Sequence, residues 1–120
     1  MVKEVTVQEV KQMFDENQDF QLIDVREQFE YDTANLGGEL IPLANVLLES
    51  DKISKDKKVV IHCRSGARSA AAIMQLEQLH GFDNLYIPGF NRTYNGNFGI
   101  GFNYSISYFI PLYKKKVIAK

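Results

Sequence analysis

Cysteine is nearly absent from this 120-residue chain, which contains Cys63 alone and no tryptophan. A single cysteine cannot form a disulfide within the chain, and zinc sites built from four cysteines are excluded. The chain also lacks a run of about 20 apolar residues, the length that a membrane-spanning helix needs. Its first residues include Glu4, where a signal peptide requires an apolar segment. We therefore expect a soluble, cytoplasmic protein.

Neither sign of charge dominates the chain, since 14 basic and 15 acidic residues leave a net charge of −1. This balance gives no reason to expect a nucleic acid or an anionic membrane as a partner. Apolar residues make up 45% of the sequence and charged residues 24%, which is ordinary for a globular domain. A chain of this length fits one domain.

Acidic residues are missing from residues 88–120, which carry a charge of +5 and leave −6 on residues 1–87. Large apolar residues alternate with small or polar ones over 98–108, a pattern typical of a strand. We therefore divide the chain into a domain over 1–87 and an atypical basic tail over 88–120, rich in aromatic residues, glycine and asparagine. Three interpretations of the tail stay open: an ordered extension that pairs as a strand or contacts a partner, a disordered segment, or a translation of the wrong reading frame.

Short apolar strands alternate with helical patterns before the tail, which predicts an α/β fold with a mainly parallel sheet flanked by helices. Strands are predicted at 3–5, 20–25, 59–62 and 84–87, and helices over 7–16, 26–31, 43–49 and 69–80. Thr6 and Glu9 form the pattern of a capping box at the start of the first helix. In the last helix, we expect Ser69 to be the N-cap and Gly81 the left-handed residue at the end.

The pattern also predicts which side chains face the core. The last helix should turn Ala72, Ile73, Leu76 and Leu79 inward. Because neighbouring side chains of a strand point to opposite faces, His62 should point away from Cys63 and serve the structure.

Two segments follow predicted strands directly: Asp24-Val25-Arg26 and the loop that begins at Cys63. In parallel α/β sheets, ligands bind beyond the carboxyl ends of the strands, so we expect the functional site there. We interpret Asp24 and Arg26 as structural support, because charged groups this close to a core usually pair.

Cys63 lies between a buried strand and a helix, in the run His62-Cys63-Arg64-Ser65-Gly66-Ala67-Arg68-Ser69. The unpaired amides and the dipole of the helix N-terminus favour a thiolate, as do two nearby arginines. Gly66 lets the backbone curl so that successive amides can point inward and bind an anion. The alternative is a buried, inert thiol, but two arginines and a glycine within five residues argue against it.

The loop from Cys63 to Ser69 resembles the active-site loop of the rhodanese family. The resemblance extends over about residues 3–87 and includes further ordered motifs: Ile23-Asp24-Val25-Arg26-Glu27, Glu30-Tyr31, Gly38, Ile41-Pro42-Leu43, and His80-Gly81-Phe82 followed by Leu85-Tyr86. The tail does not match, since the family usually continues with a helix that contains tryptophan. Asn35 stands near a position where the family often has a histidine, which puts any role of that histidine in doubt.

The resemblance implies a sulfurtransferase that carries sulfur on Cys63 as a persulfide. The donor would resemble thiosulfate, and the acceptor would be cyanide, a small thiol or a sulfur-acceptor protein. The backbone amides from Arg64 to Ser69 match the cradle that stabilises the persulfide, and Arg64 and Arg68 match side chains that favour anionic donors. No metal or organic cofactor is implied.

Two other functions remain open. Phosphatases on the same fold have one more residue between the cysteine and the arginine, so the shorter span from Cys63 to Arg68 makes a small oxyanion reductase or phosphatase the weaker prediction. The second alternative is a non-catalytic interaction or sulfur-relay module that keeps the fold. An inactive module would be expected to lose the cysteine or an arginine of the loop, and this loop keeps them.

Overall fold

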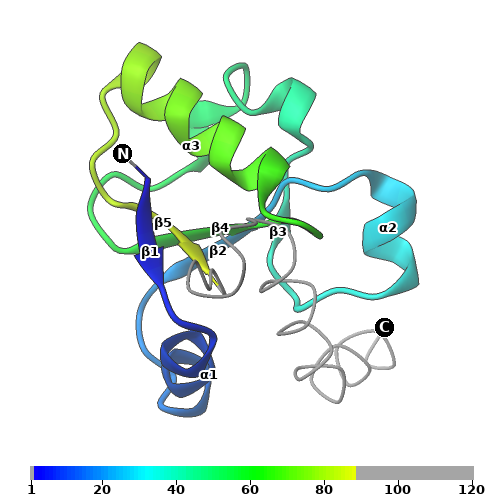
Figure 1. Cartoon of the computed structure of the whole chain (residues 1–120), viewed down its shortest axis with the longest axis vertical. Helices are drawn as coiled ribbons and strands as arrows, with labels where there is room; N and C mark the ends of the chain where they lie inside the picture. The colour runs from blue at the N-terminus through cyan, green and yellow to red at the C-terminus, as the bar shows by residue number, and fades with distance from the viewer. Residues whose placement is uncertain (1, 89–120) are drawn as a thin grey trace, which may run out of the picture.

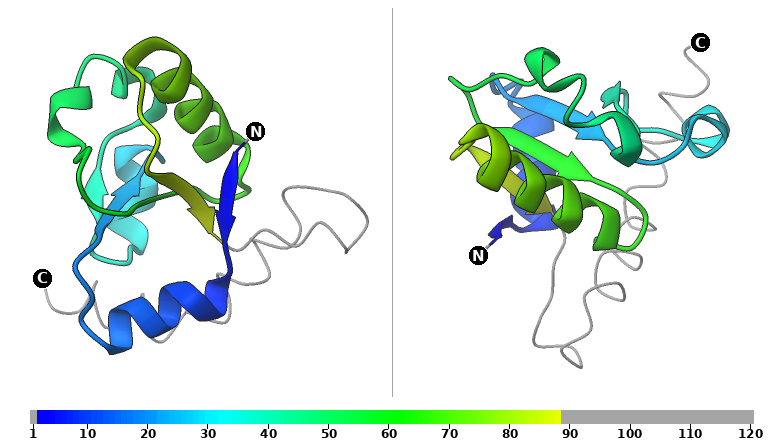
Figure 2. Two further views of the ribbon diagram at one scale, coloured as in Figure 1. Left: turned by 90° about the vertical axis from the view of Figure 1, so that its left-hand side faces the viewer. Right: turned by 90° about the horizontal axis from the view of Figure 1, so that it is seen from above.

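The computed structural model describes residues 2–88, which form a parallel five-stranded sheet with helices on both faces (Figures 1 and 2). The predicted fold class is therefore confirmed. The strands lie in the order β1-β5-β4-β2-β3. Their bounds are Lys3–Val5 (β1), Gln21–Asp24 (β2), Glu39–Leu40 (β3), Val59–His62 (β4) and Leu85–Pro88 (β5). The helices are Val7–Asp15 (α1), Gln28–Thr33 (α2) and Ala67–His80 (α3), and two 3-10 turns cover Leu43–Asn45 and Ser50–Lys52.

The two faces of the sheet bury separate apolar clusters. Helix α1 packs on one face, where Val10 and Met13 meet Leu22 of β2 and Val60 of β4. Helix α3 and the two 3-10 turns lie on the opposite side of the sheet (Figure 2). This larger cluster contains, among others, Ile23, Val59, Ile61, Cys63, Ile73 and Leu76. All four residues of β4 are buried. Because strand side chains alternate between faces, both faces of this strand are covered.

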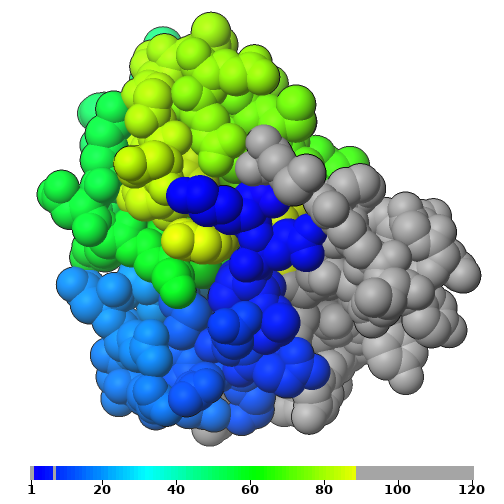
Figure 3. Space-filling model, turned by 60° about the vertical axis from the view of Figure 1, so that its left-hand side comes forward, coloured from blue at the N-terminus to red at the C-terminus, as the bar shows by residue number. Residues whose placement is uncertain are grey.

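Helix α1 begins with the predicted capping box. The Thr6 hydroxyl accepts the Glu9 amide at 3.0 Å, and the Glu9 carboxylate accepts the Thr6 amide at 2.8 Å. Strand β1 leads into this helix and covers one edge of the sheet beside β5 (Figure 3). The N-terminal elements thus close the side of the sheet that is farthest from β3.

Helix α3 ends at His80 and is followed by Gly81 in the left-handed conformation, so the prediction for its end is confirmed, but its start and its core stripe differ from the prediction. It starts at Ala67 with Gly66 as its N-cap, so the prediction that Ser69 caps the helix is wrong. Gly66 takes a φ of 94°, which an L side chain rarely adopts, and the chain therefore turns into the helix three residues early. Leu79 was expected in the core but is 65% exposed, since the core stripe of the helix ends at Leu76 and the last turn extends past it.

Three further elements differ from the prediction. The expected helix over 43–49 is a 3-10 turn, Leu43–Asn45, followed by turns. The short helix α2 starts two residues later than expected. Strand β3 is absent from the predicted strands, because its two residues carry no pattern of their own and become a strand only by pairing with Ile23 and Asp24.

The predicted tail over 88–120 lies outside the described residues, except that Pro88 ends β5. None of the helices within residues 2–88 combines the length and the apolar character needed to cross a membrane.

Candidate active site

The carboxyl ends of β2 and β4 meet side by side, as the sequence analysis expects. Asp24 is in register with His62, and the Val25 amide donates to the His62 carbonyl at 3.0 Å. Cys63 follows β4 directly and is fully buried. The two segments identified from the sequence, Asp24-Val25-Arg26 and the loop that begins at Cys63, thus lie together at the carboxyl ends of the strands.

The backbone after Cys63 curls around its sulfur. The amide of Gly66 donates to Cys63 Sγ over 3.1 Å, and the amide of Ser69 donates to it over 3.4 Å. These amides belong to the N-cap and first turn of α3, where backbone N–H groups have no partner within the helix. Two donors directed at one sulfur stabilise negative charge on it, so the local structure suits a thiolate or a persulfide anion.

Ser69 is buried and contacts the same sulfur with its side chain. Its hydroxyl donates to the Gly66 carbonyl at 3.1 Å, and its Oγ lies 3.5 Å from Cys63 Sγ, where either atom can donate. The hydroxyl thus joins Cys63 to the start of the helix. Sequence reasoning placed Ser69 at the site but missed this contact.

The other residues of the loop differ in exposure. Arg64 and Ala67 are exposed, whereas Ser65 is half-buried and its hydroxyl accepts the Ala67 amide at 3.3 Å. This local hydrogen bond helps to shape the turn that precedes α3. The positive charge of Arg64 therefore lies at the surface next to a buried sulfur.

Arg68 forms a two-pronged ion pair with Glu30 of α2. Its two terminal nitrogens donate to the two carboxylate oxygens at 2.7 and 3.0 Å. These hydrogen bonds lower the pKa of Glu30 to about 2 and raise the pKa of Arg68 above its usual value. The sequence analysis named Glu30 only as part of a motif, because partners 38 residues apart leave no periodic signal that would join them.

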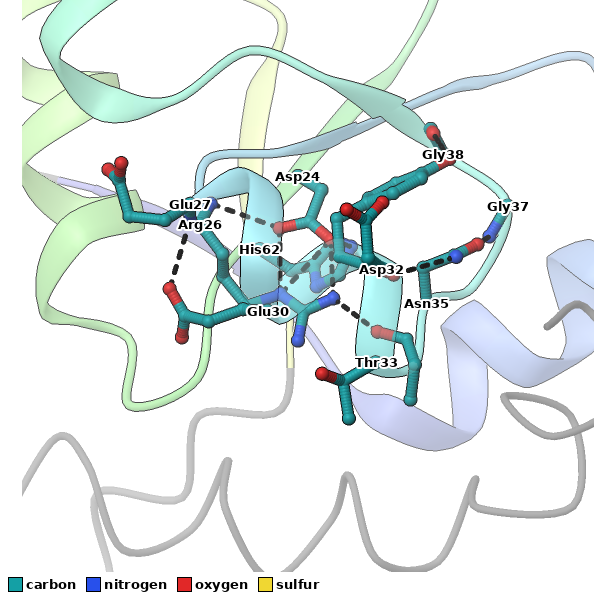
Figure 4. Close-up of polar contacts among 12 residues, drawn as sticks. Asp24, Arg26, Glu27, Glu30, Asp32, Thr33, Asn35, Gly37, Gly38 and His62 are labelled. Carbon is teal, nitrogen blue, oxygen red and sulfur yellow. Dashed lines mark hydrogen bonds and ion pairs between the residues drawn. The ribbon is translucent and has the colours of Figure 1, made fainter.

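Asp24 and Arg26 form a second, buried pair (Figure 4). Arg26 Nε lies 2.9 and 3.1 Å from the two oxygens of Asp24, and Nη2 donates to one of them at 2.7 Å. The same Nη2 also donates to the carbonyl of Ala34 at 2.8 Å. The pair therefore joins the end of β2 to the loop after α2, which is the position that a supporting role requires.

His62 lies beside this pair and not beside the sulfur. Its Nε2 is 3.8 Å from Asp24 Oδ2, whereas Cys63 belongs to the cluster under α3. Burial lowers the pKa of His62, and the nearby negative charge of Asp24 opposes this effect without reversing it. The ring is thus neutral near pH 7, as expected for a structural histidine.

Asn35 is engaged with the backbone of its own loop. Its amide nitrogen donates to the Tyr31 carbonyl at 3.0 Å, and its side-chain oxygen accepts the Gly37 amide at 2.8 Å (Figure 4). The Tyr31 hydroxyl donates to the Gly38 carbonyl at 2.7 Å. These contacts order the connection from α2 to β3.

Comparisons with known proteins find both similar sequences and similar structures. Over 101 residues the chain is 32% identical to a sulfurtransferase of Allochromatium vinosum, covering 83% of this chain and 86% of the relative. It is 30% identical to a Bacillus subtilis protein described as "Putative sulfur carrier protein YrkF", covering 73% of this chain. The chain spans about half (49%) of the length of that second relative.

Solved structures show the same fold. A rhodanese-like domain protein from Staphylococcus aureus superimposes with a TM-score of 0.64 at 28% identity, covering 72% of this chain and 82% of the other. A family model described as a domain of unknown function (DUF6048) matches residues 62–115, which is less than half of the chain. The relative from Allochromatium is matched over most of both chains, and its name agrees with the fold. The chain therefore belongs to the rhodanese-like family of sulfurtransferases.

Proposed function

We propose that this protein moves a sulfane sulfur from a thiosulfate-like donor to a thiophilic acceptor through a persulfide on Cys63. The observation that carries the proposal is the pair of backbone amides, from Gly66 and Ser69, that donate to Cys63 Sγ. A thiolate held by such donors is a competent nucleophile, and no further ionisable side chain has to bind the sulfur.

The first half-reaction consumes one thiolate and one donor. Cys63 Sγ attacks the outer sulfur of thiosulfate, and the new Sγ–S bond forms as the S–S bond of the donor breaks. The electron pair of that bond leaves with sulfite, so that Cys–S⁻ and SSO₃²⁻ become Cys–S–S⁻ and SO₃²⁻. No proton, metal or external oxidant takes part, because the oxidised sulfur comes from the donor.

The second half-reaction restores the thiolate. Cyanide attacks the outer sulfur of the persulfide and leaves as thiocyanate, while the bonding electrons return to Sγ. A small thiol can accept the same sulfur. A sulfur-acceptor protein is also part of the proposal, since the Bacillus relative is described as a sulfur carrier. We place the reaction in the cytoplasm, where reducing conditions keep a lone thiol available.

The loop residues have distinct proposed roles. Backbone amides from Arg64 to Ser69, including those of Ser65, Gly66 and Ala67, would hold the outer sulfur, in addition to the hydrogen bonds that Gly66 and Ser69 make with Sγ. The charge of Arg64 would favour an anionic donor, whereas the charge of Arg68 is paired with Glu30. The Asp24–Arg26 pair would support the strand end next to the loop. Because Cys63 is fully buried, we expect a small donor.

Intact mass spectrometry tests this proposal. After brief incubation with thiosulfate, the wild type should gain the mass of one sulfur and lose it again on addition of cyanide. Cys63→Ser should gain nothing, and because Cys63 is the only cysteine, the adduct has no other thiol to occupy. A folded wild type without the adduct would contradict the proposal and favour an oxyanion substrate or a non-catalytic module.

A further inference from the structure

The two arginines of the loop are in different electrostatic environments. Arg64 is exposed, and within residues 2–88 it forms no ion pair with an acidic side chain. Arg68 meets Glu30 through both of its terminal nitrogens, with only 29% of its side chain and 15% of the Glu30 side chain exposed. A half-buried pair of this geometry is screened by water much less than an exposed one.

Glu30 is held in place from two directions. One of its oxygens accepts both Arg68 at 2.7 Å and the backbone amide of Glu27 at 2.9 Å. The second bond belongs to the capping box of α2, so the helix itself orients the carboxylate. The lowered pKa of about 2 keeps Glu30 negative at every pH where the protein is expected to work. The fold itself therefore orients the Glu30–Arg68 ion pair, which is not a loose contact between two surface side chains.

This carboxylate changes the charge that an incoming donor meets. Arg68 has its pKa raised mainly by its hydrogen bonds to Glu30, and the nearby Cys63 sulfur adds to this effect. It also immediately precedes Ser69, whose amide donates to the sulfur. Beyond a few ångströms, however, the charges of Arg68 and Glu30 nearly cancel.

We propose that Glu30 sets the charge selectivity of the active site by neutralising Arg68, so that Arg64 supplies the full positive side-chain charge of the loop. Arg68 is then a positioning residue that ties the start of α3 to α2. This inference rests on the proposed sulfur transfer and refines its substrate class. A loop with two unpaired arginines would favour the dianion thiosulfate more strongly. Compared with such a loop, this site shifts the preference towards donors with one negative charge, such as thiosulfonates.

Two donors of matched shape separate the effect of charge from that of size. Thiosulfate is SSO₃²⁻, and methanethiosulfonate is CH₃SO₂S⁻, in which a methyl group replaces one charged oxygen. Attack by the Cys63 thiolate on the second donor gives the same persulfide and releases methanesulfinate, CH₃SO₂⁻. The rate constants for persulfide formation with both donors are measured on one sample by mass spectrometry, and their ratio is the readout.

Three variants test the role of Glu30. Glu30→Gln keeps the shape and removes the charge, so the ratio of thiosulfate to methanethiosulfonate should rise about fivefold. Arg68→Gln leaves Glu30 unpaired, so the ratio should fall by a similar factor. The double variant removes both charges, and its ratio should return to within about twofold of the wild type, because the pair contributes little net charge. Loss of folded protein lowers both rate constants equally and leaves the ratio unchanged.

The outcomes are distinct. An unchanged ratio in Glu30→Gln would overturn the inference while the proposed function stands. A double variant as low as Arg68→Gln would also overturn it and make Arg68 a direct anion receptor. If the wild type forms no persulfide with either donor, the proposed function fails, and the inference fails with it.

Discussion

At the scale of single residues, Gly38 lies where the neighbouring strand β2 leaves little room for a side chain. A Cβ atom placed there would lie 2.8 Å from both the Leu22 carbonyl oxygen and the Leu22 Cγ. The backbone of β2 cannot yield easily, because it pairs with β4 along its length. We therefore expect Gly38→Ala to lower the free energy of unfolding by about 1 to 3 kcal/mol, measured by urea denaturation.

Gly81 is a control for Gly38, because a side chain at Gly81 should destabilise the protein through backbone conformation and not through close packing. It ends α3 with a φ of 69°, yet nothing lies within 4 Å of a Cβ built there. Gly81→Ala should cost about 1 kcal/mol through backbone strain alone. Gly81→Asn should cost less, since asparagine tolerates this conformation. If Gly38→Ala were no worse than Gly81→Ala, close packing against Leu22 would not be the cause.

Features of the active site could be predicted from the sequence where residues close together in the chain form them. Cys63, Gly66 and the helix that follows form one continuous segment, so the amide cradle could be expected from the order of residues. The Glu30–Arg68 pair could not, because the fold alone brings its members together. Ser69 was predicted as the N-cap from its residue type, but Gly66 takes that position and the Ser69 hydroxyl donates to the Gly66 carbonyl within the first turn.

At the scale of elements, local sequence signals predicted the bounds of α1 more accurately than those of any other helix. Its start depends on the reciprocal hydrogen bonds of Thr6 and Glu9, which lie three residues apart. Strand β3 shows the opposite case, since two residues become a strand only through a partner strand. Elements defined by their own residues were therefore predicted, and elements defined by a neighbour were missed.

The capping box gives a prediction at this scale. Thr6→Ala removes the acceptor of the Glu9 amide and should lower the free energy of unfolding by about 1 kcal/mol. Thr6→Ser keeps the hydroxyl oxygen and should stay within about half of that loss. Thermal unfolding followed by circular dichroism compares the three proteins. An equal loss in both variants would show that the threonine methyl group, and not the cap, stabilises the helix.

At the scale of the whole molecule, the parallel sheet brings polar side chains from separate strands together at the strand ends that carry the active site. Register between β2 and β4 sets His62 against Asp24, and Arg26 completes this buried polar group on the face of the sheet away from Cys63. The sequence predicted the parallel sheet but could not give the strand order, since alternation of strands and helices is compatible with several orders. The order decides which strand ends meet, and therefore which residues surround the cysteine.

Burial of His62 makes the stability of the molecule depend on pH. Because burial lowers the pKa of His62 in the folded state, the unfolded chain binds this proton first as the pH falls below about 6.5. Protonation then favours unfolding, so this contribution to stability is present above about pH 6.5 and declines below it, with a slope of at most about 1.4 kcal/mol per pH unit. Urea denaturation of the wild type between about pH 7.5 and about pH 5 should show the decline.

The two histidines of the chain allow a matched test of this effect. His62→Gln removes the buried ring, so its stability should vary less over the same pH range than that of the wild type. His80 is exposed at the end of α3, and His80→Gln should keep the pH dependence of the wild type. Equal slopes for the wild type and His62→Gln would assign the acid sensitivity to other groups. A flatter curve for His62→Gln alone would show that the buried polar group of Asp24, Arg26 and His62 limits the stability of the whole domain in mild acid.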